Sequence, residues 1–303
     1  MNKLRLYTCL YGYTRKYKNL PVWVLTPIRR FLRKLANKQL KRYFDHKPID
    51  YSKPVSDDLI VSLTSFPARI NYVYLTVESL LRQTILPNRI VLWLSNTQFK
   101  NKEELPIRLK KLENDIFEIR FVDGDIRSHK KYYYVFKEYP NSRIVLVDDD
   151  IIYSDRMIEN LLEAKSKYPD AIISRFAFTI LRNSDYSLRP YNTWPLILQK
   201  GLYNDCFLGT GAGTLIVPSM LIKDVLNIEL ATQLTPLADD IWINAMIKLS
   251  GKNIYISSNM NFLPVLIADN ERLYDKNQGE RQNDIQLKAV NDYFANTIYG
   301  KPF

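Results

Sequence analysis

Three consecutive carboxylates, Asp148-Asp149-Asp150, directly follow the apolar run at residues 144–147. Adjacent negative charges at the end of a buried strand repel one another, and such a cluster is costly unless a cation neutralises it. Because alternate residues of an extended chain point the same way, we expect Asp148 and Asp150 to converge on one divalent ion. An ion held there would carry a diphosphate and neutralise the charge that develops as it leaves. The alternative is a solvated acidic turn that caps the next helix.

A second acidic pair, Asp239-Asp240, opens a predicted helix. Asp is a favoured N-cap residue and suits the positive end of a helix, so either residue alone has a structural explanation. Both cannot be the same cap, however. A carboxylate beside a sugar-binding cleft is suited to act as the general base that deprotonates an acceptor hydroxyl.

Basic and glycine residues near predicted strand ends supply further candidates. Arg69, Lys130 and Lys131 are candidate phosphate partners because each lies in or near a stretch that follows a strand, although solvated surface charge is the alternative. Residues 209–213 hold three of only nine glycines, which permits close approach of a sugar or an acceptor, or else forms a tight turn before a strand. No Gly-Lys-Ser/Thr follows, so this loop is not a P-loop.

The elements that must position these residues are apolar runs that alternate with helical segments. Continuous apolar strands separated by helices predict a parallel sheet covered on both faces. Ligands of such sheets bind outside the carboxyl ends of the strands, where the acidic motif falls. The predicted strands cover residues 59–63, 89–94, 117–122, 144–147 and 171–174.

Composition narrows the choice of metal and of compartment. The chain has 303 residues, and its 46% hydrophobic content is enough for a sizeable core. The two cysteines, Cys9 and Cys206, are far apart, so a disulfide scaffold is not expected and a reducing compartment fits. The two histidines, His46 and His129, cannot build a His-rich zinc site. Any metal must be held mostly by carboxylates, which indicates Mn²⁺ or Mg²⁺.

The net charge of +11 is concentrated at the N-terminus. Residues 1–47 hold 13 of the 43 basic residues and one of the 32 acidic residues, which leaves 30 basic and 31 acidic residues for the rest of the chain. A nucleic-acid binder would spread basic charge over its body, so we expect no nucleic-acid partner.

An amphipathic helix is predicted over residues 20–44, with Thr26 as its cap and Pro27 at the first helical position. A basic face opposite an apolar one suits the surface of an anionic bilayer, and the alternative is a helix packed on the body with its charges in water. No run approaches the length of a membrane span, and the start is a poor signal peptide. We therefore expect a cytoplasmic protein, peripheral at the inner face of the plasma membrane. The apolar face comprises Ile28, Phe31, Leu32 and Leu35, and the basic face comprises Arg30, Lys34, Lys38 and Lys41.

Four segments follow from these patterns. Residues 1–47 are the basic membrane-associating arm and 48–57 a linker. Residues 58–260 are the catalytic domain, with a nucleotide half at about 58–153 and an acceptor half at about 154–260. Residues 261–303 are a C-terminal extension packed on that domain.

The body resembles glycosyltransferases of the GT-A type, and is similar to bacterial enzymes that assemble capsular or lipopolysaccharide glycans. The likeness covers roughly residues 58–290. Residues 61–70 and 79–84 resemble the first strand and helix of that group, residues 147–150 match its Asp-any-Asp metal motif, and residues 238–242 resemble its acidic pair before a helix.

The resemblance implies a Rossmann-like fold, a UDP-sugar donor, and transfer without a covalent step. It implies that Asp150 is the metal ligand, that Asp148 lies near the donor ribose or the metal, and that Asp149 is among the donor-binding residues. One of Asp239 and Asp240 would be the base of an inverting displacement. Thr64 falls in the first motif, with the donor-binding candidates Arg69, Lys130 and Lys131.

The aromatic segment 176–207 is long and irregular, which in a compact domain is usually functional. Because sugar rings stack on aromatic faces, we expect it to shape the acceptor side. The predicted acceptor contacts are Trp194, Gly211 and Trp242. The acceptor itself would be a glycan or a lipid-linked saccharide of cell-surface polysaccharide synthesis.

Three rivals stay open. A retaining transferase of the same fold is possible, because one sequence does not fix stereochemistry. A nucleotidyltransferase also uses carboxylate-held metal, but it normally shows a Gly-rich signature after the first strand, and residues 62–69 have no Gly. The non-enzyme rival is a basic RNA- or lipid-binding module.

Overall fold

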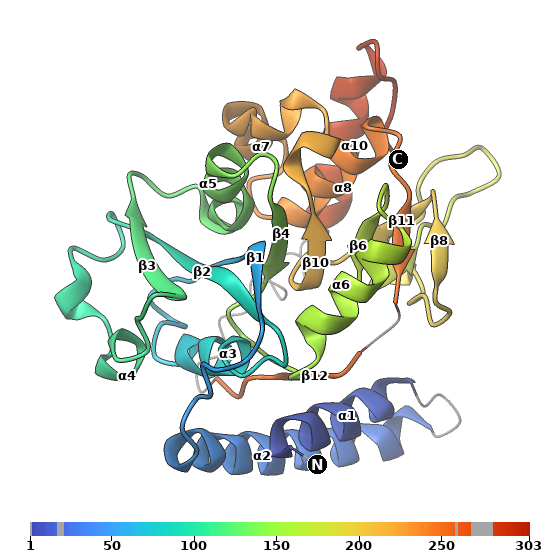
Figure 1. Ribbon diagram of the computed structural model, residues 1–303. Helices are drawn as coiled ribbons and strands as arrows, with labels where there is room; N and C mark the ends of the chain where they lie inside the picture. Colours follow the sequence, from blue (N-terminus) through green and yellow to red (C-terminus); the bar gives the residue numbers. More distant parts are fainter. Residues whose placement is uncertain (1, 17–20, 258–259, 268–280) are drawn as a thin grey trace.

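The computed structural model of the protein describes residues 2–16, 21–257, 260–267 and 281–303. Helices and strands alternate through the first half of the body, as the apolar pattern predicts (Figure 1). The helices are α1 (Lys3–Lys16), α2 (Val22–His46), α3 (Val73–Leu80), α4 (Ile107–Lys110), α5 (Lys130–Glu138), α6 (Met157–Lys167), α7 (Ile228–Leu234), α8 (Asp239–Leu249) and α10 (Gln282–Ala295). The strands are β1 (Val55–Thr64), β2 (Leu86–Ser95), β3 (Phe117–Val122), β4 (Arg143–Val147), β5 (Ile151–Tyr153), β6 (Ile172–Ser174), β7 (Ala177–Thr179), β8 (Gly201–Tyr203), β9 (Cys206–Leu208), β10 (Ala212–Ile216), β11 (Ile254–Ile256) and β12 (Phe262–Pro264).

Eight strands form the central sheet in the order β3-β2-β1-β4-β10-β6-β11-β8. Strands β3, β2, β1 and β4 pair in parallel, and so do β6 and β11. Strand β10 runs antiparallel between β4 and β6, and β8 runs antiparallel at the edge. The predicted α/β architecture with a mostly parallel sheet is confirmed, and the four parallel strands bring their carboxyl ends to one edge.

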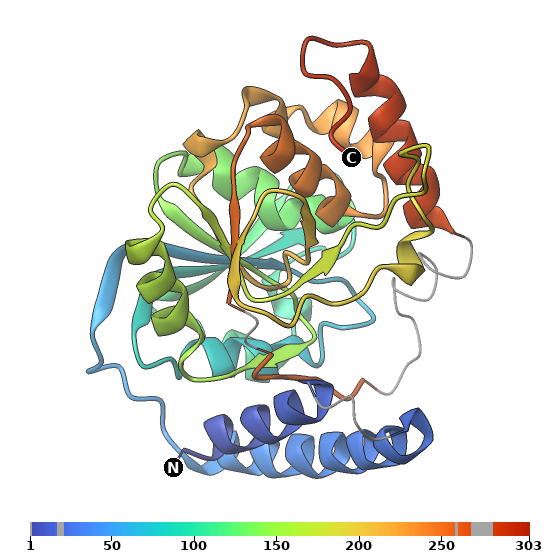
Figure 2. The ribbon, with the colours of Figure 1, turned by 90° about the vertical axis from the view of Figure 1, so that its right-hand side faces the viewer.

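Helices cover both faces of this sheet, which is why its strands are continuous apolar runs (Figure 2). In β4, Val145 and Val147 face one core together with α3 and α6, while Ile144 and Leu146 face the other core together with α5, α8 and α10. Residues 144–147 are all buried, so position 148 is the first after the strand that is partly open to solvent.

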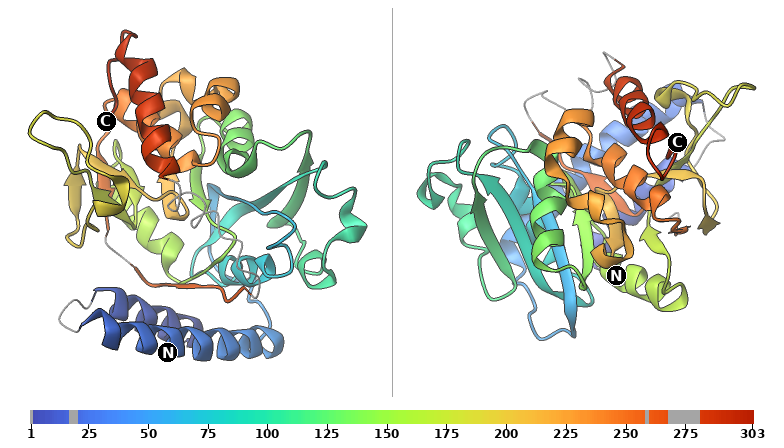
Figure 3. Two further views of the ribbon diagram at one scale, coloured as in Figure 1. Left: turned by 180° about the vertical axis from the view of Figure 1, so that it is seen from behind. Right: turned by 90° about the horizontal axis from the view of Figure 1, so that it is seen from above.

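The N-terminal helices α1 and α2 pack side by side as a separate layer against the β5–β12 ribbon (Figures 1 and 3). Helix α1 contributes Leu4, and α2 contributes Ala36, Leu40 and Phe44, to the core under α3. Helix α1 was not predicted, because its Tyr-rich and Lys-rich sequence has no clear apolar stripe.

The predicted apolar face of the second helix is not buried as a unit, since Leu32 and Leu35 are half-buried and the other two residues are not. Ile28 and Phe31 are exposed, with 40% and 65% of their surface accessible, and they share the outer side with the basic residues. The buried side carries Leu25 and Leu40 instead. The helix also begins at Val22, so Pro27 lies inside it and Thr26 does not cap it.

Other segment boundaries in the structure differ from the predicted ones. Strand β1 begins at Val55, so residues 55–57 belong to the sheet and not to a linker. Segment 176–207, expected to be irregular, contains β7, β8 and the start of β9. Of the C-terminal extension, residues 262–264 pair with β5, and α10 packs on α7 and α8; part of it, 268–280, lies outside the described residues.

Candidate active site

A cavity of about 670 Å³ opens at the carboxyl ends of β1, β2, β3 and β4. Loops that follow these strands form one wall, and the start of α8 forms the opposite wall. The lining comprises Thr64, Ser65, Phe66, Arg69, Gln98, Asp125, Arg127, Ser128, Lys130, Lys131, Val147, Asp148, Asp149, Asp150, Tyr191, Phe207, Leu237, Ala238, Asp239, Asp240, Ile241 and Asn283.

The three carboxylates of the acidic motif are not equivalent. The side chains of Asp148 and Asp150 are 43% and 32% exposed and face the cavity. Asp149 is only 5% exposed. Its carboxylate accepts hydrogen bonds from Ser65 Oγ at 2.6 Å and from Arg69 Nη1 at 2.7 Å. Asp149 therefore fixes the β1 loop against the motif, and the two outer residues remain to bind a ligand.

Arg69 also reaches Asp150, with Nη1 3.3 Å from Oδ2. Burial raises the pKa of Asp150 to about 6, with help from its neighbours Asp149 and Asp148, although the charge of Arg69 opposes the shift. The energetic cost of three adjacent carboxylates is thus only partly relieved by the protein's own cations.

Lys131 joins the two acidic sites. Its ammonium nitrogen lies 2.9 Å from Asp148 Oδ1 and 3.0 Å from Asp239 Oδ2. Burial alone would lower the pKa of Lys131, but these carboxylates, together with Asp240, raise it well above its ordinary value. Lys131 is therefore a permanent cation at the centre of the cavity.

The pKa values of Asp239 and Asp240 are shifted in opposite directions. Burial would raise the pKa of Asp239, but the charges of Lys131 and His129, together with hydrogen bonds from Lys131 and Ser128, outweigh it, so the pKa is lowered. Burial and the negative charge of Asp239 raise the pKa of Asp240 to about 7. Thr210 holds the Asp240 carboxylate through its hydroxyl and, at 3.1 Å, through its backbone N–H. A carboxylate with a pKa near neutral pH in a cavity is suited to take a proton from a bound hydroxyl.

The charge of the cavity favours a divalent cation. Its lining carries six acidic residues and four basic residues, a formal charge of −2, so a diphosphate could not enter without added positive charge. Among the described residues, no group of three or more His, Cys, Asp or Glu side chains could hold a metal alone. Two carboxylates with diphosphate oxygens do fit Mn²⁺ or Mg²⁺, since Mg²⁺ is usually bound by one or two carboxylates plus substrate phosphates. The acids are Asp125, Asp148, Asp149, Asp150, Asp239 and Asp240, and the bases are Arg69, Arg127, Lys130 and Lys131.

At the β2–β3 end of the cavity, polar side chains surround Asp125. Gln98 Nε2 donates to Asp125 Oδ2 at 2.8 Å, and Lys130 pairs with Oδ1 of the same carboxylate. Lys130 is 2% exposed, and burial lowers its pKa despite this partner. This predicted phosphate partner is therefore committed to Asp125, and Arg127 is the additional cation in the lining. Thr64 also lines the cavity, and its hydroxyl donates to the Trp93 carbonyl.

Two predicted acceptor contacts lie outside the cavity. Trp242 is fully buried, and its indole N–H donates to the Val225 carbonyl. Trp194 is 4% exposed and packs behind Tyr191 and Phe207, the two aromatic residues of this segment that do line the cavity. Tyr191 and Phe207 therefore belong to the cavity lining, and neither tryptophan does.

Gly211 contacts Asp148 and is absent from the lining. A Cβ on Gly211 would lie 1.8 Å from Asp148 Oδ2, so only glycine leaves room for that carboxylate. The Gly211 carbonyl also accepts hydrogen bonds from the Asp148 N–H and from the Tyr153 hydroxyl. The predicted close approach is real, but it accommodates the motif and not an acceptor.

Several residues that line the cavity or bond to its acids were missed by the sequence analysis. Asp125 and Arg127 follow the third predicted strand, so the same strand-end rule that selected Asp148 could have found them. Thr210 lies in the glycine loop that was singled out. Asn283, from α10, had no signal in the sequence, because only tertiary packing brings that helix to the cavity.

Comparison with known proteins finds no matching family model and no matching curated sequence. Among solved structures, the chain is similar to S. aureus TarS 1–349 in complex with UDP, at 10% identity and a TM-score of 0.48, over 79% of this chain and 72% of that one. It is also similar to the mannosyltransferase PcManGT of Pyrobaculum calidifontis in complex with GDP-Man and Mn²⁺, at 11% identity and a TM-score of 0.45, over 97% and 76%.

Proposed function

We propose that the protein is a metal-dependent glycosyltransferase that moves a sugar from a nucleotide donor, UDP in the first instance, to a glycan or lipid-linked acceptor. One observation carries the proposal. The cavity places Asp240, a carboxylate with a pKa of about 7, across Lys131 from the two exposed carboxylates Asp148 and Asp150. A general base facing a cation-binding pair is the arrangement that a single displacement at a sugar phosphate requires.

In this mechanism the diphosphate lies against Asp148 and Asp150, and the sugar lies toward α8. Asp148 and Asp150 would hold Mn²⁺ or Mg²⁺, which would supply positive charge to the departing nucleoside diphosphate. Asp240 accepts the proton of the acceptor hydroxyl, whose oxygen bonds to the anomeric carbon while the carbon–phosphate oxygen bond breaks. Attack from the face opposite the diphosphate inverts the anomeric configuration.

Asp239 and Lys131 position the reacting groups. Lys131 keeps Asp239 ionised, and the ionised Asp239 keeps the pKa of Asp240 near neutrality. Tyr191 offers an aromatic face on which an acceptor sugar can stack, and the buried ring of Phe207 supports it by an edge contact. Thr210 orients the Asp240 carboxylate by two hydrogen bonds.

The proposed setting is cell-surface polysaccharide synthesis, of the capsular or lipopolysaccharide kind, at the cytoplasmic face of the plasma membrane. The basic N-terminal helices support this setting, because they place positive charge beside the catalytic body. No described helix is long and apolar enough to cross a membrane.

The decisive experiment measures nucleoside diphosphate release from a panel of nucleotide sugars, first with Mn²⁺ and then with EDTA. We expect one donor to give metal-dependent release that is lost in Asp240→Asn and Asp150→Asn and kept in Asp57→Asn, an exposed acid away from the cavity. NMR of the product's anomeric proton separates inversion from retention. Pyrophosphate release would instead indicate a nucleotidyltransferase, and absence of both release and metal-dependent nucleotide binding would refute the proposal.

A further inference from the structure

The outer side of α2 combines exposed aromatic residues with unpaired positive charge. Trp23 is 77% exposed and Phe31 is 65% exposed, so two aromatic side chains of this helix lie in solvent. Trp23, Pro27, Arg30, Lys34, Lys38 and Lys41 follow one another at intervals of three or four residues, so they lie on one side of the helix.

These charges are not neutralised within the protein. In the described parts of the chain, neither Arg30, Lys34, Lys38 nor Lys41 has a side-chain hydrogen bond or ion pair. The one acidic residue of the two helices, Asp45, is paired with Arg108. The outer side therefore presents a positive field that attracts anionic surfaces.

A second cavity, of about 470 Å³, opens on the same layer. It is lined by Arg29, Arg30, Arg33 and Lys34 of α2, by Tyr11 of α1, and by Leu266. Arg29 donates to the Thr14 carbonyl, and Arg33 donates to the Pro264 and Val265 carbonyls, so both guanidinium groups are fixed in place. Four cations around a hollow of this size are suited to an anionic phosphate group.

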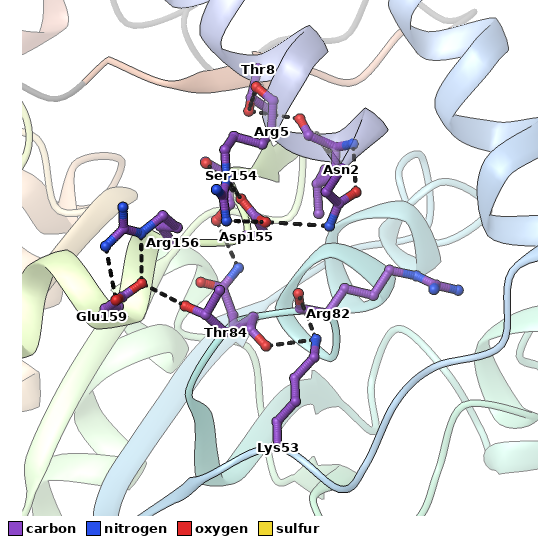
Figure 4. Close-up of polar contacts among 12 residues, drawn as sticks. Asn2, Arg5, Thr8, Lys53, Arg82, Thr84, Ser154, Asp155, Arg156 and Glu159 are labelled. Atoms are coloured by element: carbon purple, nitrogen blue, oxygen red, sulfur yellow. Dashed lines mark hydrogen bonds and ion pairs between the residues drawn. The ribbon is translucent and has the colours of Figure 1, made fainter.

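The layer is rigidly attached to the catalytic body. Arg5 of α1 donates to both oxygens of Asp155, at 3.0 and 2.9 Å, and Asn2 adds a bond at 3.3 Å (Figure 4). Asp155 is 2% exposed, whereas the side chain of Arg5 is 36% exposed, so only the carboxylate of this ion pair is shielded from water. On the other helix, Asn37 bonds to the Pro264 carbonyl and to the Leu266 N–H.

The same contacts connect the outer layer to the metal motif. The Val265 carbonyl accepts from Arg33, and the Val265 N–H donates to the Asp150 carbonyl at 2.7 Å. One segment of three residues, 264–266, thus separates the basic cavity from the candidate active site.

We propose that the outer side of α2 docks onto an anionic bilayer and that the Arg29–Lys34 cavity receives the phosphate of an anionic phospholipid. Trp23 and Phe31 enter the interface between headgroups and acyl chains, where aromatic side chains are favoured, while Arg30, Lys34, Lys38 and Lys41 contact the headgroups. The rigid attachment then holds the active site at a fixed height above the membrane, within reach of a lipid-linked acceptor. The docking does not depend on the proposed sugar transfer, so the two can fail separately.

The test uses the full-length protein and vesicles of phosphatidylcholine, alone or mixed with phosphatidylglycerol. We expect co-flotation with the mixed vesicles only. Of the four tryptophans, Trp93, Trp194 and Trp242 are buried, so a blue shift of the fluorescence on binding would report on Trp23. Trp23→Phe should abolish that shift while most binding remains.

Two matched double variants separate the cavity from general charge attraction. Arg30→Gln/Lys34→Gln and Lys38→Gln/Lys41→Gln remove equal charge from the same side of α2, but only the first pair lines the cavity. Loss of two surface charges is expected to weaken vesicle binding about 20- to 30-fold. A larger loss for the first pair supports the headgroup site, and equal losses overturn it. Lys100→Gln/Lys137→Gln, on the body, should leave binding unchanged.

If something other than an anionic bilayer bound the outer side of α2, the binding experiments would give different results. Equal binding to both kinds of vesicle, or mixed-vesicle binding without a Trp23 shift, overturns the docking proposal. So does self-association that Arg30→Gln/Lys34→Gln abolishes, measured by analytical ultracentrifugation, because a second copy would then be the occupant. Tight, salt-sensitive binding of a labelled RNA oligonucleotide through the same residues would overturn it as well. The release of nucleoside diphosphate from the sugar donor, measured without vesicles, should be the same for all these variants.

Discussion

The ammonium nitrogen of Lys131 lies 3.0 Å from Oδ2 of Asp239. This contact distinguishes two adjacent carboxylates that the sequence presents as equals. Asp239 keeps its charge because Lys131 stabilises it, and Asp240 has a pKa of about 7 because burial and the charge of Asp239 both disfavour its ionised form. The structure therefore favours Asp240 as the base and Asp239 as the residue that tunes it.

Replacing Lys131 by Met should destabilise the fold. Asp239 would then be a buried charge without its cation, and removing one partner of a buried ion pair costs about 3–5 kcal/mol. Urea unfolding measures this change in the free energy of unfolding. Lys137→Met, on the exposed side of the same helix, is the control and should change it little. Equal stability of the two variants would show that Lys131 is not needed to balance Asp239.

The rate of transfer should depend on the ionisation of Asp240. A base must be deprotonated to accept a proton, so kcat/KM should rise about tenfold per pH unit below pH 7 and level off above it. Asp240→Asn should lower the rate by about 10²- to 10⁴-fold and remove this rise.

Asp239→Asn offers a second check on the same pH profile. The charges that face Asp240 are Asp239, Lys131 and Asp148, and loss of the Asp239 charge should lower the pKa of Asp240. The rising limb should therefore move to lower pH. A limb that stays in place, measured over the same buffers, would exclude Asp240 as the group that titrates.

Metal removal and two neighbouring substitutions should have different effects. EDTA and Asp150→Asn should each abolish metal-dependent nucleotide binding and lower the rate by about 10²-fold or more, because the diphosphate loses its counter-ion. Asp150→Asn should leave the melting temperature nearly unchanged. Asp149→Asn should lower it, since Asp149 is buried and bonded to Ser65 and Arg69. The reverse pattern would mean that Asp149 is the ligand.

Gly211→Ala should impair donor binding without abolishing folding. The new methyl group would lie 1.8 Å from Asp148 Oδ2, so the carboxylate must rotate away from the cavity. Calorimetric titration with UDP and Mn²⁺ should show weaker binding than for the wild type. Gly201→Ala is the matched control, because its Cβ would meet only Tyr203, at an ordinary 3.6 Å. Unchanged affinity in Gly211→Ala would show that the position of Asp148 is not critical.

The apolar pattern by itself was sufficient to predict the sheet and to place the acidic motif at its carboxyl edge. Val145 and Val147 alternate with Ile144 and Leu146 between two buried cores, so the strand had to be continuous and apolar. The first charged residue after it had to lie at the carboxyl edge, which places Asp148 in the cavity. These are local consequences of burial, and the sequence determines them.

The roles of individual side chains needed the tertiary structure. Sequence could not show that Asp149 turns inward to Ser65, or that Lys131 reaches Asp239, because each pair is separated by more than 80 residues. It also suggested Trp242 as an acceptor contact from its place beside the acidic pair. On the helix, that position faces the core, where the indole finds Val225 as its partner.

In the N-terminal helices, too, the sequence determined the type of element and the tertiary structure decided its contacts. The sequence determined that α2 is a basic, amphipathic helix, because composition and periodicity are local properties. Which of its sides is buried was decided by partners more than 200 residues away, since Arg33 and Asn37 bond to the segment 264–266. Those contacts turn Phe31 outward and Leu40 inward, and no periodicity within the helix can specify which of two partly apolar sides a distant segment will cover.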